Sequence, residues 1–204
     1  MHISIGRRTR LTALGAGLIS AAAIAFSSAG TAVADTADTG GTAALSIPRS
    51  VVVGLGKSTV IMLPGSPASA TYGAGAETFS MPVTGGTGEV SNFSGVVDLG
   101  GKLVVVNTKA GKTVNITDLE LNFFTGAITG VLPGSTAHTA LAYLSGDLST
   151  SSDPGPPATE SVSCTEVDMS AKLASALNTA LNTTAFVKGT NLGSFTATFD
   201  VTIT

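Results

Sequence analysis

The sequence of 204 residues is poor in the side chains on which most catalytic and metal sites depend. It contains no Trp, one Cys and two His, and only 11% of its residues are charged. The single cysteine, Cys164, excludes an intrachain disulfide, and its alternation with Val162 among Ser and Thr predicts a buried small side chain. C-x-x-C, H-E-x-x-H, calcium-loop and G-x-S-x-G patterns are all missing from the sequence. We therefore expect no metal site and no catalytic residues, and the sequence favours a protein that is not an enzyme.

Residues 1–34 are predicted to be a cleavable signal peptide. Three arginines give a positive start, residues 11–26 are apolar and uncharged, and an Ala-Val-Ala triplet ends at residue 34. The apolar run is too short and too poor in large side chains to be a comfortable membrane anchor. We expect a secreted, extracellular protein, with cell-envelope association as an option and no membrane span after cleavage.

The charge balance restricts the partners. Cleavage would leave seven basic against 13 acidic residues, a formal charge of about −6. No basic patch remains to contact phosphates, so we expect no nucleic-acid partner. An anionic bilayer is disfavoured for the same reason. The expected partner is an unknown extracellular protein, an envelope component or a small ligand.

Apolar and polar residues alternate over most of the remaining chain, and Gly or Pro stands at the breaks. The alternation is cleanest near the C-terminus, where Phe195, Phe199 and Val201 share one face. This pattern predicts an all-β fold, an antiparallel β-sandwich of the immunoglobulin-like type. We expect a flexible lead-in over residues 35–42 and a single sandwich domain over residues 43–204.

One short segment, residues 51–59, contains a Gly-Lys-Ser element that is also found in phosphate-binding loops. The first glycine that such a loop requires would fall at Val51, and β-branched residues follow where a helix should start. We therefore predict a short strand over residues 51–53 and a hairpin turn over residues 54–59 with an exposed Lys57.

The phase of the alternation changes once, within the central block. Val114 and Ile116 are the apolar positions before the change, and Leu119 and Leu121 are those after it. Because side chains in a strand alternate with a period of two, an unbroken strand would turn one of these pairs to water. We predict a bulge or sharp bend at residues 117–118, where the strand crosses from one sheet to the other.

Residues 170–182 are predicted to form the one short C-terminal helix. Ser170 is a suitable N-cap, and leucines recur every four residues from Leu173 to Leu181. Asn182 is suited to the left-handed position that ends a helix. We expect the leucine stripe to pack on the sheet rather than to bind a partner.

Several segments resemble the HtaA-like domain family, which comprises secreted or surface β-sandwich domains of actinobacteria. The similar segments are FSMPVTGG at residues 79–86, FSG at 93–95, VNITDLEL at 114–121 and TGAITG at 125–130. The resemblance covers about half of the mature chain and implies the family's fold. It does not extend to the Trp-bearing segment that carries the iron-ligating tyrosine in the haem-binding members.

A binding or cell-envelope role without catalysis or cofactor is the expected function, and two alternatives remain open. The resemblance suggests a haem carrier that uses Tyr143 or Tyr72 with His138. On a regular strand, however, the offset of five would put His138 and Tyr143 on opposite faces. The other alternative is a glycan or cell-wall hydrolase that uses Asp118 and Glu120, although a solvated strand face explains that pair more simply.

Overall fold

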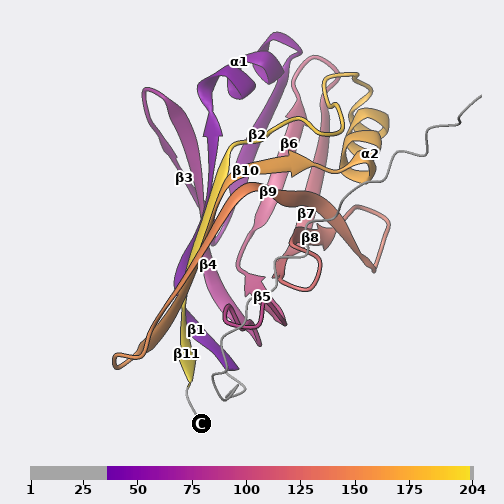
Figure 1. The fold of residues 1–204 in the computed structure, drawn as a ribbon. Helices are drawn as coiled ribbons and strands as arrows, with labels where there is room; N and C mark the ends of the chain where they lie inside the picture. The colour runs from indigo at the N-terminus through magenta and orange to yellow at the C-terminus, as the bar shows by residue number, and fades with distance from the viewer. Residues whose placement is uncertain (1–35, 203–204) are drawn as a thin grey trace, which may run out of the picture. The chain divides into compact units, whose positions relative to one another are not determined.

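The structure, a computed structural model, describes residues 36–202 (Figure 1). The predicted signal peptide lies outside the described residues. The elements in chain order are β1 (Thr36–Pro48), α1 (Arg49–Lys57), β2 (Val60–Gly65), β3 (Ser69–Tyr72), β4 (Ala76–Gly86), β5 (Val96–Leu99), β6 (Lys102–Asn107), β7 (Lys112–Asn122), β8 (Ala127–Val131), β9 (His138–Asp153), β10 (Ala158–Met169), α2 (Ala171–Leu181) and β11 (Ser194–Thr202).

Eight strands form a closed antiparallel barrel in the order β7-β5-β4-β1-β11-β10-β9-β8, and β8 pairs with β7 to complete the ring. The all-β antiparallel prediction is confirmed. The immunoglobulin-like arrangement of two separate sheets is not what the pairing shows. The reason is that the C-terminal half of β7 pairs on one side with β5 and on the other with β8, so the ring has no open edge there.

A smaller sheet branches from the barrel at β7. The N-terminal half of β7 pairs with β6, and β6 pairs in turn with β2 (Figure 1). The change from one sheet to the other falls at Asp118, whose φ is 49°, beside a register shift against β8 between Thr117 and Glu120. Val114 and Ile116 are buried before this point, and Leu119 and Leu121 after it. The predicted irregularity at residues 117–118 is confirmed.

Asp118 gives a direct test of this bend. The left-handed backbone region is open to Gly, tolerated by Asp and strongly disfavoured for β-branched side chains. We expect Asp118→Gly to change the free energy of unfolding by less than about 1 kcal/mol and Asp118→Val to lower it by about 2 kcal/mol. Urea denaturation measures both. Asn115→Val, an exposed position on the regular part of β7, is the control; an equal loss there would contradict the backbone explanation.

The barrel interior is filled by the inward-facing residues of its strands. Phe195, Ala197 and Phe199 of β11 are at most 1% exposed, as the alternation of that segment predicted. Cys164 is also buried and free, and its Sγ approaches the carbonyl oxygen of Glu166 at 3.0 Å. The expectation of a buried thiol is therefore confirmed.

Helix α2 confirms the C-terminal helix prediction. The backbone N–H of Leu173 donates to Ser170 Oγ at 3.0 Å, and Asn182 ends the helix with a φ of 53°. The stripe from Leu173 through Leu177 to Leu181 is buried. Within residues 36–202, no helix is long and apolar enough to cross a membrane.

Helix α1 corrects two predictions, because the expected strand over residues 51–53 and most of the expected turn over 54–59 are helical. Leu55 is buried, and Val51, four residues earlier, packs against the same core, so the helix presents one apolar side inward. The N–H of Arg49 donates to the carbonyl of Gly75 at 3.0 Å, which holds the helix start against the turn before β4. Lys57 is exposed, as predicted.

The glycines of the expected lead-in serve close packing rather than flexibility. Strand β1 already pairs with β11 at Gly41 and with β4 at Thr42. Gly41 has a φ of 94°, and a Cβ there would collide with the backbone of Thr198 and Phe199. The prediction of a flexible segment over residues 35–42 is thus wrong for Gly41 and Thr42, where the approach of β11 leaves no room for a side chain.

Candidate ligand-binding groove

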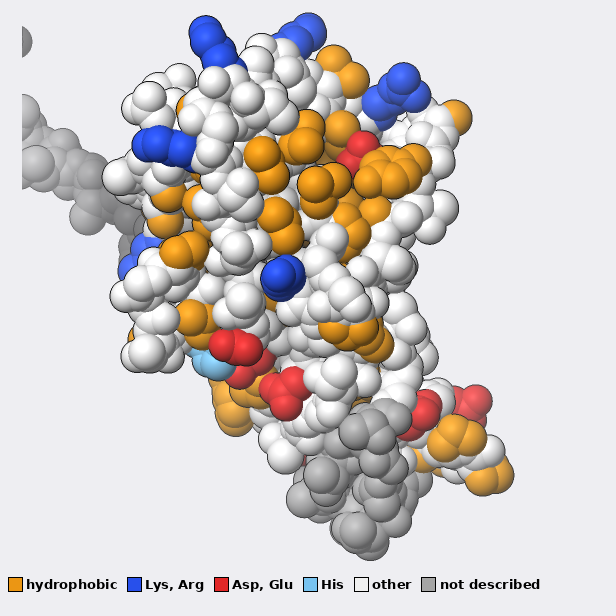
Figure 2. All heavy atoms as spheres, turned by 180° about the vertical axis from the view of Figure 1, so that it is seen from behind, with side chains coloured by type: hydrophobic (Ala, Val, Ile, Leu, Met, Phe, Trp, Pro, Cys, Tyr) orange, Lys and Arg blue, Asp and Glu red, His pale blue; other side chains and the backbone are white. Residues whose placement is uncertain are grey.

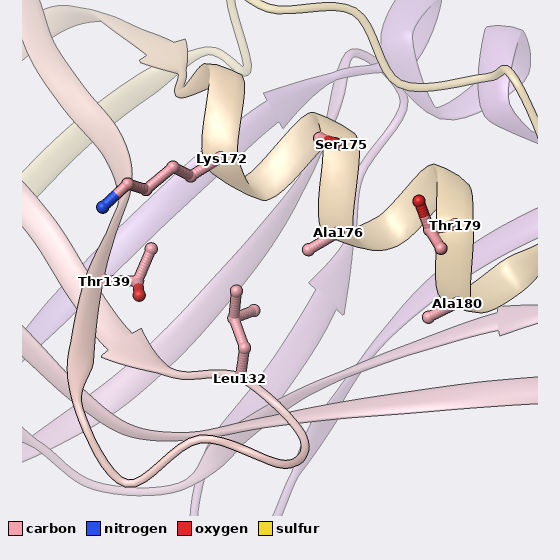
Figure 3. Close-up of a pocket in the computed structure, with 7 residues that line it drawn as sticks. All are labelled: Leu132, Thr139, Lys172, Ser175, Ala176, Thr179 and Ala180. Atoms are coloured by element: carbon pink, nitrogen blue, oxygen red, sulfur yellow. The ribbon is translucent and has the colours of Figure 1, made fainter.

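A groove of about 500 Å³ runs between α2 and the chain that links β8 to β9 (Figure 3). We call it the α2 groove. The groove is broadly open to solvent, and its volume is within the range of small-molecule sites. The lining residues are Leu132, Thr139, Lys172, Ser175, Ala176, Thr179 and Ala180.

The sequence of α2 explains why its outer side forms a hollow. The buried leucines occupy one face of the helix, and Lys172, Ser175, Ala176, Thr179 and Ala180 follow the spacing of the face beside it. Four of these five side chains are small. The helix therefore leaves space between itself and Leu132 on the facing segment (Figure 3).

Hydrogen bonds fix both ends of this helical wall. Ser170 Oγ donates to the carbonyl of Ala140 at 2.6 Å, which ties the N-terminus of α2 to β9. At the other end, Asn107 Nδ2 donates to the carbonyl of Leu181 at 3.1 Å. Helix α2 is therefore held in place without a ligand, and binding would not cost the free energy of ordering it.

The groove contains one charged side chain. Lys172 lies at the end next to Thr139, whereas Ala176 and Ala180 lie farther along the helix (Figure 3). Among residues 36–202, no carboxylate lies within ion-pair distance of Lys172. Hydroxyl groups of Thr139, Ser175 and Thr179 supply the other polar atoms of the lining.

Of the predicted site residues, His138 lies at the start of β9 but does not line the groove. Its Nε2 is 3.3 Å from Glu120 Oε1, and Thr129 Oγ1 donates to Glu120 Oε2 at 3.1 Å. His138 is adjacent in sequence to Thr139, which does line the groove. Because successive residues of a strand point to opposite faces, His138 turns toward the outer surface of the barrel instead.

The two tyrosines are also outside the groove. Tyr143 on β9 is 46% exposed and Tyr72 on β3 is 63% exposed. A bulge at Leu141 lets His138 pair with Val131 and Tyr143 with Ala127, four residues apart on β8. They therefore share a face, contrary to the expectation for a regular strand.

This shared face does not bring His138 and Tyr143 together. Four residues of strand separate them by about 13 Å, whereas an iron ligand and the group that orients it must be in hydrogen-bonding contact. Neither tyrosine lines the α2 groove or the hollow beside Asp118 and Glu120. The role of Tyr143, Tyr72 and His138 in binding haem stays a prediction.

Asp118 and Glu120 border a second hollow, of about 350 Å³, on the outside of β5 and β7. Asp98 of β5 is the direct cross-strand neighbour of Glu120. Figure 2 shows the acidic side chains of this face gathered beside His138, below a broad area of hydrophobic side chains. Within the described part of the chain, no group of His, Cys, Asp and Glu has the arrangement of a metal site. The arrangement is consistent with the simpler explanation of a solvated strand face.

The α2 groove was not predicted from the sequence. The available sign was the set of small residues and one Lys at helical spacing beside the leucines of α2. The facing wall, Leu132 and Thr139, belongs to a segment separated from α2 by the long β9–β10 hairpin. Only the three-dimensional structure shows that Leu132 and Thr139 lie across the groove from α2.

The protein is thus a closed antiparallel barrel with a smaller side sheet, and helix α2 forms one wall of its groove. No protein-family model matches the chain, and no curated protein matches it in sequence. Among solved structures, the chain is similar to the C-terminal domain of HtaA from Corynebacterium glutamicum, with a TM-score of 0.54 and 12% identity over 82% of this chain and 99% of that domain. It also aligns with the haem-binding protein HtaB from the same organism, with a TM-score of 0.48 and 13% identity over 82% of this chain and 94% of HtaB.

The resemblance to HtaA-like domains is thereby confirmed at the level of the fold. The protein has the fold of the HtaA C-terminal domain along almost the whole of that domain. At this identity the likeness concerns the arrangement of the backbone and assigns no residue role.

Proposed function

We propose that this chain is an exported, non-enzymatic binding protein with the HtaA-like fold, and that its ligand occupies the α2 groove. The single observation that supports it most is the groove itself, about 500 Å³ in volume. Its lining combines apolar and hydroxyl-bearing side chains with Lys172, which has no carboxylate within ion-pair distance among residues 36–202. Small-molecule sites have this composition, mostly apolar with a few polar groups that orient the ligand. The signal-peptide pattern of residues 1–34 supports export, and the partner is a small ligand of the extracellular space or envelope.

A thermal-shift panel on the mature protein tests this function. Binding to the folded state alone raises its stability by RT ln(1 + [L]/Kd), about 2.7 kcal/mol at a ligand concentration of 100 times Kd. We expect at least one class in a panel of amphipathic anions, glycans and wall peptides to raise Tm. The ligand should be recovered chemically unchanged. A panel without any stabilising compound, or a ligand recovered as a product, would contradict the proposal.

The haem carrier remains the alternative, because some members of the HtaA-like family take up haem. In this chain, the lining of the α2 groove contains no Tyr, His, Cys or Met. We therefore expect hemin titration to give no Soret band of tyrosinate ligation. The Tyr72→Phe, Tyr143→Phe double variant serves as the control. A Soret shift in the unaltered chain that disappears in this variant would establish the carrier function instead.

A further inference from the structure

We infer that the α2 groove takes a medium-chain amphipathic monoanion, with its carboxylate at Lys172 and its apolar chain along Ala176 and Ala180. This inference rests on the proposed binding function and adds the chemical class and the orientation of the ligand. Two independent features of the groove carry it: the position of its charge and the length of its apolar track.

The charge lies at one end only. Lys172 is the single charged residue of the lining, and no carboxylate among residues 36–202 lies within ion-pair distance of it. It also stands in the first turn of α2, where the helix dipole already favours a negative group. The ammonium group extends from the helix toward the end of the groove where Thr139 lies (Figure 3), so an anion bound there would meet a positive charge. A cation would be repelled there.

The remainder of the groove suits an apolar chain. Lys172 and Ala180 are eight residues apart, which corresponds to about 12 Å along the helix axis. Leu132 on the facing segment and Ala176 on the helix line this length with carbon atoms, and Ser175 and Thr179 supply only neutral hydroxyl groups. Because the far end has no second charged residue, a ligand with a single anionic head fits better than one with a charge at each end.

Calorimetric titration of the mature protein with sodium octanoate tests the assignment, with 1-octanol and octylammonium as the uncharged and charge-reversed probes. We expect one octanoate per chain, binding of octanol weaker by about fivefold and binding of octylammonium weaker than that of octanol. Lys172→Gln should weaken octanoate by the same factor and leave octanol unchanged. Ala176→Leu, which fills the track, should weaken both by more than tenfold. Lys188→Gln, an exposed lysine outside the lining, should change neither.

Lys172 and Lys188 are exposed and Ala176 is partly buried, and circular dichroism shows whether each variant retains the fold. Octanoate binding that Ala176→Leu does not change, equal affinity for octylammonium, or the lack of any octanoate binding would overturn the inference. If octanoate fails while another compound of the thermal-shift panel stabilises the protein, the inference falls and the proposed function stands. If no compound of the panel stabilises it, both fall.

Discussion

Replacing Phe123 by alanine is expected to lower the free energy of unfolding by about 3–5 kcal/mol, the usual loss for a fully buried aromatic side chain. Phe123 follows the end of β7 and is 1% exposed. Its ring meets Phe93 edge-on at a centroid distance of 5.2 Å and Phe199 at 6.1 Å. One side chain thus joins β7, the β4–β5 loop and β11, and its removal leaves a cavity that none of these elements can close alone.

The neighbouring residue provides a matched control. Phe124 has the same side chain and is 73% exposed. We expect Phe124→Ala to change the free energy of unfolding by no more than about 0.5 kcal/mol. Urea denaturation, with unchanged slopes for both variants, measures the difference. Comparable losses from the two substitutions would show that the chain beyond β7 does not enter the barrel as the structure places it.

Asn107 is expected to give the second large effect. Its side chain is 5% exposed and lies at the end of β6. Its Oδ1 accepts from the N–H groups of Lys109 and Ala110 and from the hydroxyl of Thr59, at 3.0–3.1 Å. Its Nδ2 donates to the carbonyl of Leu181 at 3.1 Å. A single amide thus connects the β6–β7 turn, the start of β2 and the end of α2.

Asn107→Ala takes away the partner of the Leu181 carbonyl in a buried hydrogen bond and of the part-buried N–H groups of Lys109 and Ala110, and we expect a loss of about 2–4 kcal/mol. Amide hydrogen exchange should also become faster in the last turn of α2, because the carbonyl of Leu181 loses its donor. Asn115→Ala is the control, since Asn115 is exposed on β7 and its side chain forms no hydrogen bond within residues 36–202. A change below 0.5 kcal/mol for Asn107→Ala would mean that the network adds nothing to the fold.

The features that could be predicted from the sequence are those that local periodicity determines. The shift of apolar parity around Asp118 indicated the bend in β7, and the four-residue spacing of leucines indicated α2 and its buried face. The alternation from Phe195 to Val201 indicated which residues of β11 fill the interior. Each of these depends only on which side of an element is apolar.

The closure of the barrel could not be predicted in this way, because alternation shows which face is buried and not which strand is the neighbour. β7 pairs with three different strands, and no local pattern specifies that. Helix α1 was missed because the β-branched run from Val51 to Val53 is typical of a strand. There, the packing of Leu55 in the core and the hydrogen bond of Arg49 to Gly75 outweigh the local preference.

The site could be predicted least. His138, Tyr143 and Tyr72 attract attention because their side chains are chemically versatile, and the structure distributes them over exposed positions. The α2 groove is lined mainly by alanine, serine and threonine, which carry no distinctive chemistry in a sequence. It exists because small residues on a helix face Leu132 and Thr139 across a space, which is a property of packing.

Amide chemical-shift mapping of the isotope-labelled mature protein during titration with sodium octanoate tests the central claim most directly. The account predicts progressive shifts confined to residues 132–139 and 171–181, with the resonances of Tyr72, Tyr143 and the acidic hollow unchanged. Shifts centred on either tyrosine or on Asp98 and Glu120, or no shifts at saturating octanoate, would contradict it.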